Sequence, residues 1–134
     1  MANSYIGEIK MVGFNFAASG WAFASGQTIA ISQNTALFTL IGTTYGGDGV
    51  QTFQLPDLRS RMPMHMGQGV GLSTRTIGQT GGAESATFPS AQVPSSPVAP
   101  IQALASQSAV VSSLSPFLTV NFIIALFGIF PSQN

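Results

Sequence analysis

The chain has 134 residues, of which 45% are hydrophobic and only 6% are charged, and its formal net charge is zero. Because an ordinary soluble domain has about 25% charged residues, this chain has little charge with which to keep its copies apart. Neutrality excludes the basic surface that nucleic-acid binding requires, and the absence of cysteine excludes disulfides and thiolate metal sites. The length suits a single domain, 1–134, that buries much of its surface against other chains.

The N-terminal part of the sequence predicts short strands followed by one helix. The alternation in "YIGEIKMVGFNF", residues 5–16, indicates a half-buried strand, and "SGWAFASGQTIAI", residues 19–31, indicates two short strands around a turn. The period then changes to helical in "SQNTALFTLI", with Ser32 as the candidate N-cap and Gly42 as the C-cap. We therefore expect one helix near residues 32–41.

The later part of the sequence predicts two more strands and a long loop. "VQTFQL", residues 50–55, has the composition of a strand, whereas Pro63 and the glycines of 67–82 indicate an irregular edge and loop. The apolar run 117–130 is too short for a membrane span, and its Val, Ile and Phe content indicates a strand buried on both faces. The expected fold class is α+β, mostly β, in a small domain with many loops.

Charge is distributed unevenly along the chain. All eight charged residues lie between Glu8 and Glu84, and residues 85–134 contain none. We expect this uncharged part to be largely interfacial, with the Pro/Ser/Ala-rich segment 95–116 as a candidate docking arm. The start "MANSYIGEIK" has neither a basic nor an apolar region, so we expect synthesis in the bacterial cytoplasm without a signal peptide.

The stretch "TTYGGDG", residues 43–49, concentrates turn residues around one carboxylate. A calcium loop needs several oxygen side chains, and here Asp48 stands alone. Gly46, Gly47 and Gly49 are therefore expected to permit tight turns with positive φ, while Asp48 accepts hydrogen bonds from its own backbone.

A second group of charges follows in "PDLRSR", residues 56–61. Asp57, Arg59 and Arg61 alternate, so in a strand they would share one face. Two interpretations remain open at this point: a structural ion pair between Asp57 and either arginine, or an arginine pair that binds a carboxylate or phosphate on a receptor glycan.

No motif in the sequence supports catalysis. His65 is the single histidine, and the nucleophile-elbow motif is absent. A cell-wall glycan hydrolase would need two suitably spaced carboxylates, and "GQGVG" at 67–71 matches a phosphate loop only weakly. A metal would need three copies of His65 on a threefold axis, so we expect no enzyme activity, cofactor or metal, and an ordinary hydrogen bond at His65. The acids available are Glu8, Asp48, Asp57 and Glu84.

The segment "ISQNTALFTLIGTTYGGDGVQTFQLPDLRSRMPMHMGQGVGLS", residues 31–73, resembles the phage tail collar domain family, which includes the microcystin-dependent proteins. The likeness extends back to "YIGEIKMVGF" and forward to "TIGQTGGAESAT" and "LTVNFIIALFGIFPSQN". The resemblance implies a small β-rich collar domain, intertwined as a trimer, and a virion location at the tail fibre or tail tip, or in a contractile injection particle. The structural signature that it implies is Gly46, Gly47, Asp48, Gly49, Pro56, Asp57, Leu58, Arg59 and Arg61.

The resemblance also implies partners and a role. The expected role is structural, in assembly and host attachment, with the same chain and other tail-fibre, tail-tip or baseplate proteins as partners and no membrane insertion. Because the collar motif begins at Tyr5 without a fibre shaft, we expect this subunit to dock onto a fibre, tail tip or baseplate. The alternative is a carbohydrate-binding adsorption module for a host surface glycan. Its candidate contacts are Trp21, Tyr45, Arg59 and Arg61.

The sequence departs from the family pattern at one place. Many members have a His-x-His-like pair after "AQVP", and in some fibre tips such pairs bind metal. Here the corresponding segment 95–98 is "SSPV". This departure argues against a metal site of that kind.

Overall fold

A computed structural model describes residues 3–88 and 109–133. The chain forms two compact units, one of residues 1–79 with 119–134 and one of residues 80–118. Most of the candidate docking arm 95–116, and the segment 95–98 that replaces the His-x-His pair, lie outside the described residues. Each unit is described by itself below.

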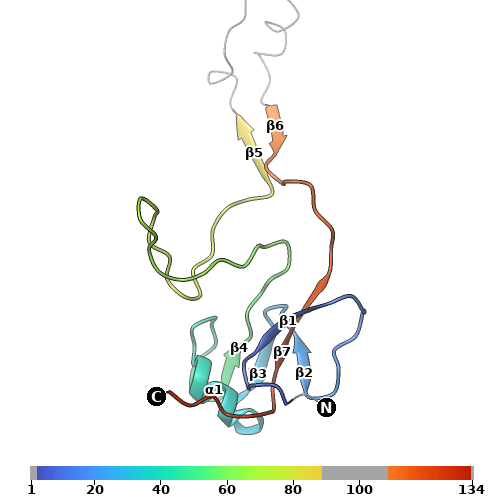
Figure 1. Cartoon of the computed structure of the whole chain (residues 1–134), viewed down its shortest axis with the longest axis vertical. Coiled ribbons are helices and arrows are strands. Elements are labelled where there is room, and N and C mark those ends of the chain that lie inside the picture. Colours follow the sequence, from blue (N-terminus) through green and yellow to red (C-terminus); the bar gives the residue numbers. More distant parts are fainter. Residues whose placement is uncertain (1–2, 89–108, 134) are drawn as a thin grey trace, which may run out of the picture. The chain divides into compact units, whose positions relative to one another are not determined.

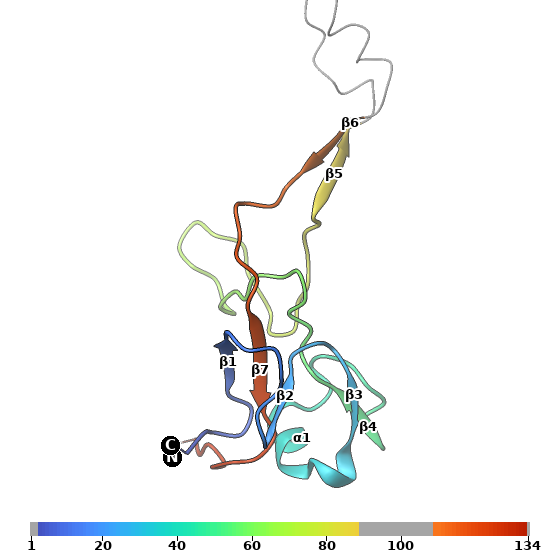
Figure 2. The same cartoon turned by 90° about the vertical axis from the view of Figure 1, so that its right-hand side faces the viewer.

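Two small antiparallel sheets build the first unit. The larger sheet has the order β1-β7-β2, so that β7 (Asn121–Ala125) lies between β1 (Ile9–Val12) and β2 (Trp21–Phe23) (Figures 1 and 2). The smaller sheet pairs β3 (Thr28–Ala30) with β4 (Thr52–Gln54). The two short strands predicted around the turn at 25–26 are therefore confirmed, but they belong to different sheets.

The helix is shorter than predicted and begins later. A 3₁₀ turn, η1 (Ile31–Gln33), precedes α1 (Thr35–Ile41), and Asn34 is the N-cap residue instead of Ser32. The Asn34 N–H donates to the Ile31 carbonyl at 3.0 Å and closes the 3₁₀ turn. The Asn34 side chain donates to the Ala30 carbonyl at 3.0 Å, and α1 has no side-chain cap. The predicted C-cap is confirmed, because Gly42 adopts φ 53° and its N–H donates to the Phe38 carbonyl at 2.8 Å.

The prediction of a half-buried strand over residues 5–16 is wrong in extent and in burial. Gly7, with φ 85°, turns the chain before β1 begins, so Ile6 is buried outside the strand. β1 then pairs with β7 alone, as an edge strand, and Met11 remains 68% exposed. The backbone turn at Gly7 thus separates Ile6 from β1, although the apolar and polar residues alternate across this position in the sequence.

The strand β7 confirms the prediction of a buried strand in the C-terminal apolar run, over a shorter length. Ile123, Ile124 and Ala125 are consecutive and all buried, because both faces of the central strand are covered. The flanking residues Phe117 and Phe127 are exposed. The apolar run therefore contributes five residues to the sheet rather than its full length.

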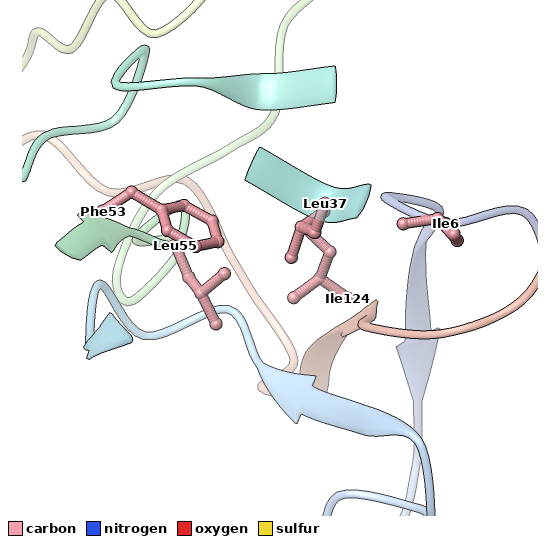
Figure 3. Close-up of a cluster of buried hydrophobic side chains, with 5 residues drawn as sticks. All are labelled: Ile6, Leu37, Phe53, Leu55 and Ile124. Atoms are coloured by element: carbon pink, nitrogen blue, oxygen red, sulfur yellow. The ribbon is translucent and has the colours of Figure 1, made fainter. Parts of the chain in front are cut away.

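The hydrophobic core joins the helix to both sheets. Leu37 of α1 and Phe53 of β4 are fully buried, and the Phe38 ring packs on Phe53 with centroids 5.3 Å apart. Figure 3 shows the core side chains converging from the helix, from both sheets and from the turn before β1. The buried core cluster consists of Ile6, Leu37, Phe53, Leu55 and Ile124.

The described residues of the second unit form an antiparallel pair of strands, β5 (Ser85–Phe88) and β6 (Ala109–Ser112). Beyond the pair, Ser113 continues the register, since its N–H donates to the Glu84 carbonyl at 2.9 Å. Every residue of both strands is exposed.

These elements confirm the expected fold class: a small, loop-rich, mainly β structure with one short helix. Among the described residues, no helix has the length and apolar character needed to cross a bilayer.

Candidate functional site

The glycine loop after α1 is organised around the carboxylate of Asp48. One oxygen, Oδ1, accepts the backbone N–H groups of Val50, Gln51 and Thr52 at 2.8, 2.9 and 2.9 Å. These bonds stabilise the ionised carboxylate and lower the Asp48 pKa to about 2. The expectation that Asp48 bonds its own backbone is confirmed.

The glycines of this loop allow it to lie directly on β4. Gly46 and Gly47 have φ of 123° and 100°, and Gly49 has φ of 72°, values that side chains rarely tolerate. A Cβ at Gly47 would collide with the backbone of Phe53, and one at Gly46 would collide with the Gln54 side chain. The loop is thus a structural device that covers β4.

The second group of charges forms a turn and an ion pair. Arg59 binds Asp57 through two bonds, Nε to Oδ1 at 2.9 Å and Nη2 to Oδ2 at 2.8 Å. These hydrogen bonds hold the pKa of Asp57 at about 2. The structural ion pair is therefore formed with Arg59.

The idea that Asp57, Arg59 and Arg61 share a strand face is wrong. The N–H of Arg61 donates to the Leu58 carbonyl at 3.2 Å, and Ser60 adopts φ 56°, so the segment is a turn. Backbone bonds hold this turn to the residues after β2, with Leu58 N–H donating to the Ala24 carbonyl at 2.9 Å.

An open hollow of about 350 Å³ lies beside this turn. Its walls are mainly apolar and come from the end of β2, the turn, and the start of β7. The residues that line it include four apolar side chains and one cation: Phe23, Leu58, Val120, Phe122 and Arg59.

The four candidate receptor contacts come from three segments, with Arg59 and Arg61 in the same turn. Trp21 is on β2, Tyr45 is in the glycine loop, and of the four residues Arg59 is the one that lines the hollow. The Lys10 ammonium lies 5.0 Å from the centre of the Trp21 ring and 3.3 Å from Glu8, so a cation already covers this indole. Tyr45 is half-buried, and this burial raises the pKa of its hydroxyl.

His65 makes an ordinary hydrogen bond, as expected. Its Nδ1 lies 2.6 Å from the Met66 carbonyl, which can only accept, so Nδ1 donates. Within the part of the chain that the structure describes, no three His, Asp or Glu side chains gather closely enough to hold a metal ion.

Sequence reasoning missed two features of the surface. The rings of Phe14 and Phe16 stack at 4.7 Å although both are exposed, and Asn121 anchors their loop by donating to the Phe14 carbonyl at 2.8 Å. Large apolar side chains are also exposed along 62–77 and 110–120. The low charge of the chain was the one sequence signal that pointed to such a surface. The exposed side chains include Met62, Met64, Leu72, Val110, Phe117 and Leu118.

The structure is a small β-rich domain. Asp48, Asp57 and the glycines at 46, 47 and 49, which the sequence analysis singled out, mainly hold its loops and turns in place. Residues 7–63 match the family model of the Phage Tail Collar Domain. This match over residues 7–63 confirms the predicted resemblance to that family. No curated protein matches the chain.

Proposed function

We propose that this protein is a structural component of a phage tail or phage-tail-like particle, located at the tail fibre or tail tip. The observation that carries the proposal is the collar-domain match over residues 7–63. Within this range Asp48 and Asp57 accept hydrogen bonds that hold a loop and a turn in place. In this role the protein acts in particle assembly and in host attachment, with other tail-fibre, tail-tip or baseplate proteins as partners.

The exposed apolar surface supports assembly as a homotrimer. Met62 and Phe117 are 84% and 74% exposed in the single chain, and soluble monomers rarely expose apolar surface over such long segments. Residues 85–134 carry no charge that would oppose association of like chains. Burial of this surface between copies removes it from water and stabilises the assembly.

Imaging of the particle tests the location. Gold-labelled antibodies against this chain should bind at one end of the tail in electron micrographs of particles produced with the chain. Particles from a strain that lacks its gene should show no label and should adsorb poorly to the host. Label on the head, or on particles from the deletion strain, would contradict the proposed location.

We also propose that the protein is not an enzyme. A glycan hydrolase needs a carboxylic acid whose pKa is raised so that it can donate a proton, whereas Asp48 and Asp57 have pKa values of about 2. Glu8 is paired with Lys10 at 3.3 Å. Incubation of the purified protein with peptidoglycan should release no soluble fragments, and release that disappears in Asp48→Asn or Asp57→Asn would refute this.

The alternative function is adsorption to a host surface glycan. The hollow beside Arg59 favours it, because a guanidinium next to an apolar wall suits an acidic sugar. Trp21 contributes less than the sequence suggested, since Lys10 already lies over its ring. A glycan array separates the candidates: binding of acidic glycans that is lost in Arg59→Met, with folding retained, would establish adsorption, whereas an array without bound glycan leaves the structural role.

A further inference from the structure

The β5–β6 pair has two chemically different faces. Its register places Ala86 opposite Val111 and Phe88 opposite Ala109, and alternation along each strand puts these four side chains on one face. The other face carries the opposed pairs Ser85–Ser112 and Thr87–Val110. One face is therefore wholly apolar, whereas three of the four residues on the other are polar.

Among the described residues of its unit, none buries the apolar face. Phe88 and Val111 are 43% and 49% exposed, although both strands are hydrogen-bonded in register. An isolated two-stranded pair is marginally stable in water and needs a partner for its apolar side. The face thus predicts a contact with something outside the pair.

The face is complementary to a copy of itself. Each cross-strand pair joins a large side chain to an alanine, so Phe88 and Val111 project beside the low positions Ala86 and Ala109. A second copy can place its projections over these low positions, as packed apolar surfaces do. The strands contain no charged residue, so identical faces meet without electrostatic repulsion.

We propose that the apolar face of the β5–β6 pair packs against the same face of the other copies in the assembly, which makes it a trimer contact. The inference rests on the proposed homotrimer and deepens it, because three copies of one face can meet around a threefold axis. Its occupant is a second copy of this chain, and not a host glycan or a different tail protein.

Single cysteines test the inference cleanly, because the chain has none of its own. Val111→Cys places one thiol on the apolar face, and Val110→Cys, its neighbour of the same residue type, places one on the opposite face. After mild oxidation of the full-length protein, Val111→Cys should run largely as a disulfide-linked dimer in non-reducing electrophoresis, with the third chain left as monomer. Val110→Cys should remain mostly monomeric, although Val110 is the more exposed at 70% against 49%.

Random collision favours the more exposed thiol, so the expected order cannot arise from accessibility. Equal cross-linking, or faster cross-linking of Val110→Cys, would overturn the inference. If Val111→Cys fails to fold, Ala86→Cys with Thr87→Cys as its control gives the same comparison. Light scattering of the parent chain separates the two levels: a trimer without cross-linking at the apolar face refutes this contact alone, and a monomer refutes the homotrimer itself.

Discussion

Asp48 gathers three backbone hydrogen bonds on one carboxylate oxygen, so a single side chain fixes the path of the loop between α1 and β4. Asp57 holds Arg59 in a similar way through both of its oxygens. Both residues lie in the stretch where the sequence concentrates its charge. There the two carboxylates accept hydrogen bonds that stabilise a loop and a turn.

Two replacements of Asp48 should distinguish its role as a hydrogen-bond acceptor from the role of its negative charge. Asp48→Ala removes all three acceptor bonds and should lower the melting temperature clearly, whereas Asp48→Asn keeps an acceptor oxygen and should lower it less. Differential scanning calorimetry at neutral pH measures both. Equal melting temperatures for the parent and Asp48→Ala would show that the loop does not need this carboxylate.

The same carboxylate predicts a loss of stability in acid. Its folded-state pKa of about 2 lies below the ordinary value of 3.8, so its stabilising contribution is present above pH 3.8 and is lost as the pH falls toward 2. Asp57 adds a contribution in the same window. Chemical unfolding followed between about pH 5 and about pH 2 should show a smaller decline in Asp48→Asn than in the parent. Identical declines would contradict this assignment.

Gly47 tests how closely the loop approaches β4. Gly47→Ala should lower the free energy of unfolding by about 1–3 kcal/mol or more, because φ of 100° strains alanine and the new methyl collides with the Phe53 backbone. Gly13→Ala is the matched control, since nothing lies within 4 Å of its Cβ position. Denaturant titration that gave the same midpoint for both variants would argue against the close approach.

At the scale of elements, α1 is the point at which the two sheets share a core. Leu37 is fully buried, and it lies in one cluster with Phe53 of β4 and Ile124 of β7. The helix has only seven residues and no side-chain N-cap, so packing rather than intrinsic helicity maintains it.

Truncation of Leu37 should therefore weaken both sheets together. Leu37→Ala should lower the free energy of unfolding by about 2–5 kcal/mol through lost burial and the cavity left behind. The conservative Leu37→Met should stay within about 1.5 kcal/mol of the parent. A midpoint in Leu37→Ala close to that of Leu37→Met would mean that α1 is not the shared centre of the core.

Local sequence signals predicted which helices and strands form better than they predicted the residues at which these elements begin and end. The helix forms where Leu37, Leu40 and Ile41 predicted it, but its expected first residues form a 3₁₀ turn, which the Asn34 N–H closes on the Ile31 carbonyl. β1 was overextended because a turn at Gly7 is not visible in the alternation of side chains. The sequence predicted an ion pair of Asp57 with either arginine, and the structure forms it with Arg59. The chain turns at Ser60, which has a positive φ, and the residue types in this segment did not predict that turn.

At the scale of the whole molecule, the scarcity of charge determines what kind of interface the proposed homotrimer would have. The chain has four basic and four acidic residues, none of them beyond Glu84, while exposed apolar side chains continue through 62–77 and 110–120. An interface made from such surface depends on apolar burial, and screening by salt has little effect on it.

The proposed homotrimer should accordingly persist in salt. Light scattering should give a mass near three times the 13.9 kDa of one chain, and the mass should hold when ionic strength rises from about 0.05 M to about 0.5 M. Sulfate should strengthen the association, because it enhances apolar burial. A stable monomer at micromolar concentration, or dissociation by sodium chloride, would contradict an apolar interface.

The central place of β7 has a consequence for the order in which the protein folds. β7 pairs with both β1 and β2, and Asn121 binds the Phe14 carbonyl across 107 residues of chain. During synthesis β1 and β2 emerge long before the strand that joins them, so the nascent sheet stays open until residues 121–125 leave the ribosome. Contacts of such long range form slowly, and until they form, the apolar strands lack their cover. Until β7 has paired with both of them, β1 and β2 therefore lack the partner that joins them into one sheet.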